Sequence, residues 1–138
     1  KTIVITCYIY FLMNGLQLLL VEDNFLNQKL IFLNLNRYGV VIDVANNGAD
    51  AVEKVREKKY DLILMDLMMP IMDGFAATKA IREIESEKGM HTPIVGLTAN
   101  NFDADREKCL SAGMDEYMTK PFDIEVFKDT LRVLGIVS

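Results

Sequence analysis

Short apolar runs alternate with longer amphipathic stretches along most of the chain. The apolar runs have the length of buried strands, and the stretches between them carry apolar residues at helical spacing. The sequence therefore predicts strands at residues 17–21, 40–45, 61–65, 93–98 and 116–119. It predicts helices at residues 24–38 (with Asn24 as the cap), 49–58, 75–85, 104–111 and 124–134.

This alternation indicates the fold class. Strands that are apolar throughout are typical of a parallel sheet that is covered on both faces, and helices between successive strands supply that cover. We therefore expect an α/β fold of the flavodoxin-like, doubly wound (βα)5 type, with a central five-stranded parallel sheet.

The first part of the chain, residues 1–15, differs from the rest. It is rich in β-branched and aromatic residues and ends in the turn pair Asn14-Gly15, which predicts a strand-like extension before a domain at residues 16–138. Its apolar run is too short to span a bilayer and lacks a small-residue cleavage site. Two origins are open at this point, a remnant of a longer protein and a leader before a start at Met13. Such an extension could also pair with a second copy of the chain.

Length, composition and charge narrow the function classes. With 138 residues, of which 51% are hydrophobic and 25% charged, the chain suits one globular domain. Its net charge of −5 argues against binding nucleic acid or anionic lipid by electrostatic attraction alone. Cys7 and Cys109 match no metal or redox spacing, which favours reduced thiols in a cytoplasmic protein.

Polar side chains with complementary chemistry follow the predicted strands. Glu22 and Asp23 follow the first strand, Asp66 the third and Lys120 the fifth, and Thr98 ends the fourth. In open parallel sheets, ligands bind at the carboxyl ends of the strands. We therefore expect these five side chains to meet in one cleft.

The chemistry of this set predicts a metal-assisted reaction. Three carboxylates at close quarters repel one another unless a cation lies among them, and their hard oxygen ligands suit Mg²⁺. Lys120 adds a second positive charge, and Thr98 adds a hydroxyl donor. Because phosphoryl transfer depends mainly on positioning and charge stabilisation, the set predicts phosphoryl transfer onto Asp66.

Four ordered motifs carry a resemblance to a known family. They read "LLLVEDN", "LMDLMMPIMDG", "PIVGLTAN" and "DEYMTKPF". Together they resemble the landmarks of the receiver domain of two-component response regulators, and the chain is most similar to receivers of hybrid histidine kinases. The resemblance covers residues 16–134, and only the extension departs from the pattern.

The resemblance implies a role for each of these residues. Asp66 would be the phosphoacceptor, and the Mg²⁺ ligands would be Glu22, Asp23, Asp66 and the backbone carbonyl of Met68. The phosphoryl oxygens would be held by Thr98, the backbone of Ala99, and Lys120. Thr98 and Tyr117 would form the conformational switch, and the bond before Pro121 would be cis. The domain would accept phosphate and assist its own slow dephosphorylation without being an enzyme in its own right.

The resemblance also implies partners. A histidine kinase or a histidine phosphotransfer domain would supply the phosphoryl group, because His91, the only histidine, lies in a predicted loop. No direct nucleic-acid binding and no membrane span are expected in this chain. Dimerisation would use the extension or the face formed by residues 104–111, 116–119 and 124–134.

The first predicted helix has more apolar residues than one core contact requires. Leu26, Leu30 and Leu33 form a stripe at helical spacing that is expected to face the sheet. On another side lie Phe25, Phe32 and Leu35. Either these three residues dock a histidine phosphotransfer domain, or the extension covers them.

Other functions were weighed against this one. Aspartyl-phosphate hydrolases of the haloacid dehalogenase type have an Asp-x-Asp pattern, in which the second acid acts on the leaving group. In this sequence the second position is Met68, which cannot transfer a proton. A flavodoxin-like cofactor binder needs a phosphate loop after the first strand, where this chain has two acids. A receiver that binds partners without taking phosphate stays open.

Overall fold

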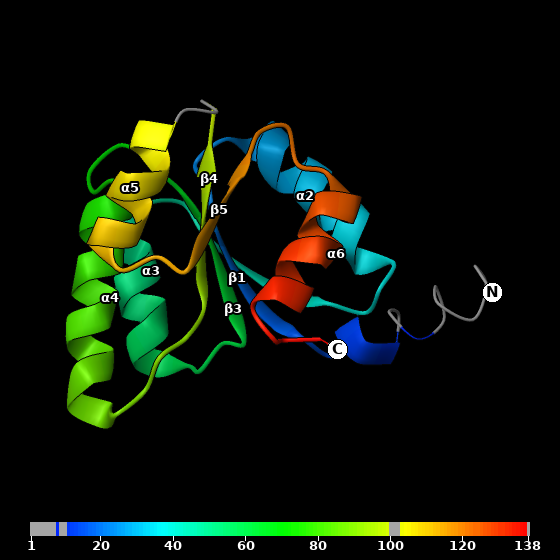
Figure 1. Cartoon of the computed structure of the whole chain (residues 1–138), viewed down its shortest axis with the longest axis horizontal. Helices are drawn as coiled ribbons and strands as arrows, with labels where there is room; N and C mark the ends of the chain where they lie inside the picture. Colours follow the sequence, from blue (N-terminus) through cyan, green and yellow to red (C-terminus); the bar gives the residue numbers. More distant parts are fainter. Residues whose placement is uncertain (1–7, 9–10, 100–102, 138) are drawn as a thin grey trace.

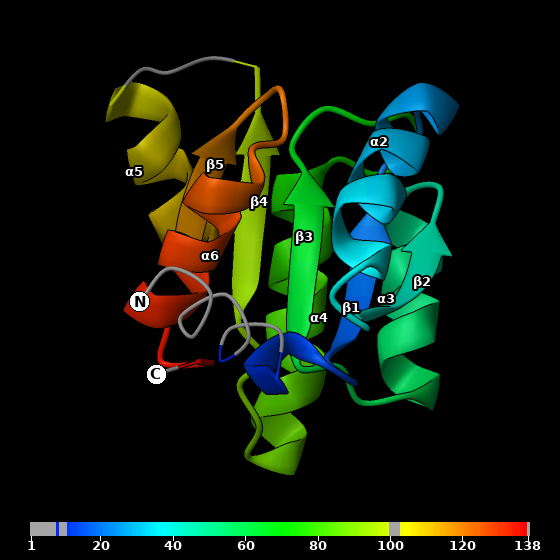
Figure 2. The same ribbon diagram turned by 90° about the vertical axis from the view of Figure 1, so that its right-hand side faces the viewer.

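The predicted five-stranded parallel sheet is confirmed by the computed structural model, which describes residues 8, 11–99 and 103–137. The strands are β1 (Gln17–Val21), β2 (Val41–Ala45), β3 (Leu62–Asp66), β4 (Ile94–Thr98) and β5 (Glu116–Thr119). They lie in the order β2-β1-β3-β4-β5, and all of their neighbouring pairs are parallel (Figure 2). The order reverses between β1 and β3, which is the position where such sheets bind ligands.

The predicted helices cover both faces of the sheet. They are α2 (Phe25–Asn36), α3 (Gly48–Glu57), α4 (Gly74–Lys88), α5 (Asp103–Ala112) and α6 (Ile124–Val133). Helices α2 and α6 lie on one face, and α3, α4 and α5 on the other (Figure 1). Helix α4 is longer than predicted because it ends only at Gly89, whose left-handed φ of 64° allows its N–H to bond the carbonyls of Glu85 and Ser86.

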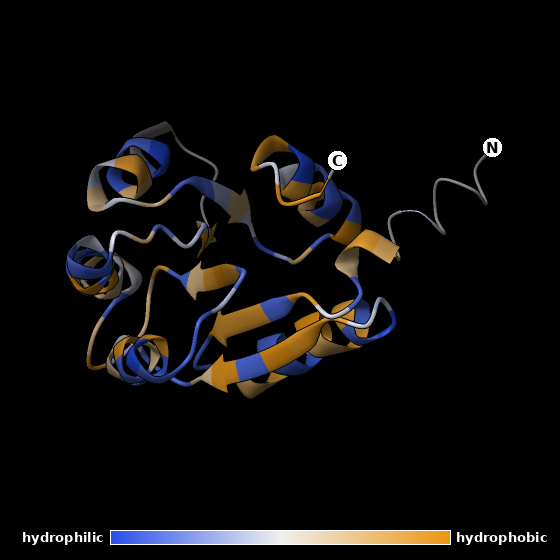
Figure 3. Cartoon of the chain, turned by 90° about the horizontal axis from the view of Figure 1, so that it is seen from below, coloured by the Kyte–Doolittle hydropathy of each residue, from blue (hydrophilic) through white to orange (hydrophobic). Residues whose placement is uncertain are grey.

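The core consists of two apolar clusters separated by the sheet. Along β1, Leu18 and Leu20 belong to the cluster under α2 and α6, whereas Leu19 and Val21 belong to the cluster under α3 and α4. All four side chains are fully buried. The central strands therefore carry apolar residues on both faces, as expected for a parallel sheet covered on both sides. Figure 3 shows the hydrophobic colour along much of these strands.

The face of α2 that meets the sheet differs from the predicted one. The predicted stripe is largely exposed, since 73% of Leu26 and 62% of Leu33 are accessible to solvent. Ile31 and Leu35 are buried in the core instead. The proposed docking role of Leu35 was therefore wrong, because no partner can reach this side chain while the core is intact.

The reason lies in the polar residues of the same helix. The apolar residues of α2 are distributed around most of its circumference, so the hydrophobic pattern does not select one face of the helix. The side chains of Asn27 and Gln28 hydrogen bond to Glu22 at the end of β1. Asn27 and Ile31 lie on the same side of the helix, one turn apart, so the bond from Asn27 to Glu22 directs Ile31 toward the sheet.

The described end of the extension is helical and not a strand. Residues 11–13 form a helical turn, after which Asn14 and Gly15 reverse the chain into β1. The prediction of an added strand was wrong for these residues, because they form a helical turn that places the Met13 side chain in the core. Residues 1–7 and 9–10 lie outside the described residues. The predicted pairing of the extension with a second copy of the chain therefore stays a prediction.

Met13 anchors this turn in the core. Its side chain is fully buried in the cluster under α2 and α6, and its carbonyl accepts a hydrogen bond from the N–H of Leu16. The N–H of Gly15 donates to the carbonyl of Gly39 at 2.8 Å.

Within the described part of the chain, no helix has the length and apolar character needed to cross a membrane.

Candidate functional site

Three acidic side chains meet where β1 and β3 end. The register pairs Val21 with Met65, so that Glu22 and Asp66 follow side by side. Glu22 is fully buried, 4% of Asp66 is accessible, and Asp23 is exposed. Ligand oxygens of the three residues all lie within 4.8 Å of one another.

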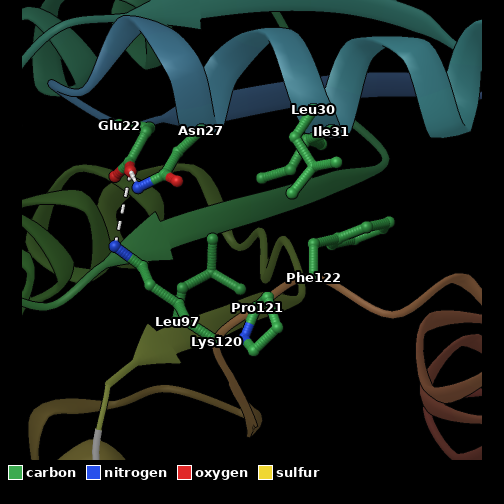
Figure 4. A pocket seen from close by; sticks show the side chains of 8 residues that line it. All are labelled: Glu22, Asn27, Leu30, Ile31, Leu97, Lys120, Pro121 and Phe122. Carbon is green, nitrogen blue, oxygen red and sulfur yellow. Dashed lines mark hydrogen bonds and ion pairs between the residues drawn. The ribbon is translucent and has the colours of Figure 1, made fainter.

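A lysine from the far side of the sheet completes this group. Lys120 follows β5, and its Nζ lies 3.3 Å from Oε1 of Glu22 and 3.2 Å from Oδ2 of Asp66. Figure 4 shows the contact with Glu22 as a dashed line. The peptide bond between Lys120 and Pro121 is cis.

The electrostatics of the group favour a bound cation. Burial, together with the neighbouring Asp66, raises the pKa of Glu22 to about 7. Asn27 and Lys120 both donate to Oε1 of the Glu22 carboxylate, and Oε2 has no hydrogen-bond partner among the described residues. A buried carboxylate oxygen without a partner is costly, and one lysine cannot neutralise three acids. The hard oxygen ligands fit Mg²⁺.

The loop after β3 is folded tightly around Asp66. A Cβ at Gly74 would lie 2.3 Å from the carbonyl oxygen of Asp66, so only glycine lets α4 begin so close to this strand. The N–H of Met68 donates to Oδ1 of Asp66 at 3.3 Å. The Met68 side chain is 78% exposed at this end of the sheet.

The residues expected to bind phosphate and to switch lie on β4 and β5. Thr98 is buried at the end of β4, and its hydroxyl donates to Oδ2 of Asp105 on α5 at 3.0 Å. Ala99 follows and is exposed. Tyr117 on β5 is half-buried and packs against the cluster under α3 and α4.

Two residues of the site were missed by the sequence reasoning. The side-chain amide of Asn27 donates to Oε1 of Glu22 at 2.6 Å. That of Gln28 donates to the Glu22 carbonyl at 2.6 Å and to Oδ1 of Asn46 at 2.9 Å. The available signal was three amide residues within the first turn of a helix that directly follows the two acids, Asn24 among them.

Apolar side chains lie exposed close to the acids. Phe25 and Leu26, which begin α2 directly after the acidic pair, are 70% and 73% exposed. Ile71, in the loop after Asp66, is 84% exposed. Exposed apolar side chains that gather beside a polar site are candidates for contact with another molecule.

Comparison with known proteins gives a consistent result. The family model described as "Response regulator receiver domain" matches residues 18–132. Hybrid signal transduction histidine kinase B of Dictyostelium discoideum is 51% identical in an alignment 114 residues long, and the match covers 76% of this chain and 6% of that protein. The chain spans between 4% and 15% of the length of the first curated relatives that it matches.

Two solved structures are similar to this one. The receiver domain of the histidine kinase CKI1 from Arabidopsis thaliana, complexed with Mg²⁺ and BeF3⁻, superposes with a TM-score of 0.84 and 28% identity, covering 94% of this chain and 95% of that one. The co-crystal structure of the Saccharomyces cerevisiae histidine phosphotransfer protein Ypd1 with the receiver domain of Ssk1 gives a TM-score of 0.80 and 32% identity, covering 86% and 87%.

Proposed function

Since this chain belongs to the response regulator receiver domain family, we propose that it takes a phosphoryl group from a phosphohistidine onto Asp66. The observation that carries this proposal is the setting of Asp66 itself. Its carboxylate ends the central strand β3, contacts the ammonium of Lys120, and lies beside a buried oxygen of Glu22 that has no hydrogen-bond partner in the described part of the chain. A hydrolase that acts through Asp66 would need a side chain that transfers a proton at the position of Met68, and the exposed Met68 side chain offers no proton.

The residues of the site divide the work of the transfer. Glu22, Asp23, Asp66 and the carbonyl of Met68 would hold Mg²⁺, which supplies positive charge to the phosphoryl oxygens. An oxygen of Asp66 attacks phosphorus, and the phosphorus–nitrogen bond breaks with its electron pair remaining on the donor imidazole. Lys120, Thr98 and the N–H of Ala99 stabilise the charge on the transferred group.

Metal dependence provides the first test. With Mg²⁺ and a small-molecule phosphodonor, the intact mass should increase by one phosphoryl group. Removal of Mg²⁺ with EDTA should reduce the rate by about a hundredfold or more, because uncompensated acids would face the incoming anion. Mass spectrometry over time measures both conditions. An equal rate with and without the metal would contradict the proposed role of the acids.

Phosphorylation should also change the conformation through Thr98. A phosphoryl group on Asp66 offers the Thr98 hydroxyl a charged acceptor, which competes with the present bond to Asp105. If Thr98 turns inward, Tyr117 gains room to move, and the face formed by α5, β5 and α6 is altered. This face would then signal to the next protein.

The switch has a spectroscopic signature. Beryllofluoride with Mg²⁺ should shift amide resonances around Tyr117 and along α5, and Thr98→Val should reduce these remote shifts severalfold because it lacks the hydroxyl. Two-dimensional NMR of both proteins measures the effect, with Mg²⁺ alone as the control. Shifts confined to the three acids would count against the switch.

We also propose that the exposed side of α2 docks the phosphodonor protein. The structure replaces part of the surface predicted from the sequence. Leu35 is excluded, and the exposed apolar residues of the helix are Phe25, Leu26, Leu30, Phe32 and Leu33. A histidine phosphotransfer domain on this surface would reach the acids at the start of the same helix. Such a donor would belong to a cytoplasmic phosphorelay, in which this domain is part of a hybrid histidine kinase.

Docking and chemistry are separable by mutation. Leu26→Ala or Phe32→Ala should slow phosphotransfer from a histidine phosphotransfer domain about tenfold, since truncation of an interface anchor costs on the order of 1–2 kcal/mol. Phosphorylation by a small phosphodonor should not change. Val133→Ala is the matched control, because Val133 is 72% exposed on α6. Equal loss with the protein donor and the small donor would exclude a docking role.

A further inference from the structure

The carboxylate of Glu22 is held asymmetrically. The side-chain amide of Asn27 donates to Oε1 at 2.6 Å, and Lys120 approaches the same oxygen at 3.3 Å. Figure 4 shows both contacts ending on one oxygen, with the Asn27 amide nitrogen directed at it. The second oxygen, Oε2, is buried and lacks a hydrogen-bond partner among the described residues.

Asn27 is itself fixed by the fold. Its backbone N–H donates to Oδ1 of the cap residue Asn24 at 3.0 Å, which places it in the first turn of α2. One turn later, Ile31 is buried against the sheet and sets the rotation of the helix. The side-chain amide of Gln28 donates to the main-chain carbonyl of Glu22. The first turn of α2 therefore determines both the backbone and the side chain of the buried acid.

We propose that Asn27 is a positioning residue for the metal site, which occupies Oε1 of Glu22 and thereby directs Oε2 to the cation. The inference rests on the proposed function, because it assumes that Mg²⁺ binds beside Glu22. Without the amide, Lys120 would be the only donor to the carboxylate among the described contacts. The carboxylate would then be free to rotate, and both of its oxygens would compete for the lysine that also serves Asp66. Residues that orient metal ligands commonly contribute an order of magnitude or more to affinity.

The test measures Mg²⁺ binding directly on the unphosphorylated protein. In calorimetric titration, Asn27→Ala should weaken Mg²⁺ binding by about tenfold. The melting temperature in EDTA should stay close to that of the unmodified protein. Phosphorylation by a small phosphodonor should need a correspondingly higher Mg²⁺ concentration and still reach the unmodified extent at saturation. A purely structural role would not produce this separation of metal affinity from maximal phosphorylation.

Two further variants make the result decisive. Asn34→Ala is the matched control, because the Asn34 amide bonds only the Leu30 carbonyl of the same helix in the described contacts. Asn27→Ser keeps a polar side chain too short to reach Glu22 and should behave as Asn27→Ala does. Unchanged Mg²⁺ affinity in Asn27→Ala, or equal weakening in Asn34→Ala, would overturn the inference. Failure of the unmodified protein to bind Mg²⁺ would instead overturn the proposed function on which it rests.

Discussion

Asp66→Asn should abolish phosphorylation by both a small phosphodonor and a protein donor. The amide has nearly the same size as the carboxylate, but it lacks the anionic oxygen that attacks phosphorus. It also removes one of the three charges that attract the cation. The expected effect is complete loss of the added phosphoryl group within the detection limit of intact-mass measurement.

Two controls separate loss of the nucleophile from loss of structure. Asp129→Asn changes a largely exposed carboxylate on α6 in the same chemical way and should leave phosphorylation intact. The melting temperature of Asp66→Asn should not fall, because the substitution relieves repulsion with the buried Glu22. Phosphorylation of Asp66→Asn to the unmodified level would show that another residue accepts the group.

Met68→Asn or Met68→Glu should accelerate loss of the phosphoryl group by about tenfold or more. Hydrolysis of an acyl phosphate needs a water held in line with the breaking bond, and positioning of that kind alters rates by orders of magnitude. The exposed Met68 side chain lies two residues beyond Asp66 and offers only a weak thioether acceptor. We therefore expect slow dephosphorylation of the unmodified protein, which a polar side chain at this position relieves.

The decay is followed by intact mass in Mg²⁺ after removal of the phosphodonor. Ile71→Asn is the matched control, because Ile71 is an equally exposed apolar residue of the same loop with a left-handed φ of 71° that asparagine tolerates. Its decay should match that of the unmodified protein. Equal decay in the unmodified protein and the Met68 variants would show that Met68 does not restrict the water. Asn100, two residues beyond Thr98, is also expected to flank the path of the water, and it lies outside the described residues.

The sequence was sufficient where a local pattern has one structural solution. The apolar run that ends at Asp66 is too short for a helix and is apolar at every position, so a central parallel strand is the arrangement that buries it. Once the strands were known, the geometry of parallel sheets carried Glu22, Asp66 and Lys120 to one edge. The contacts of Lys120 with both acids are the result expected from this reasoning.

The sequence was insufficient where two solutions had similar local cost. Apolar residues surround α2, so Leu26 and Ile31 were equally plausible core residues until the contact of Asn27 with Glu22 chose between them. The bond between Thr98 and Asp105 joins a strand to the following helix, and no periodicity indicates it. The extension was read from its β-branched composition, while the burial of Met13 that accompanies the helical turn is a tertiary contact, which local composition does not indicate.

The buried position of Met13 has a consequence for dissecting and recombining proteins of this kind. A fragment cut at Leu16, just before the part that the family model matches, would lose a side chain that fills the interior and the turn that is bonded to Gly39. Residues 11–13 therefore belong to the folded unit and are more than a connection to it. A transplanted receiver should keep these residues, so that the interior position of Met13 stays filled.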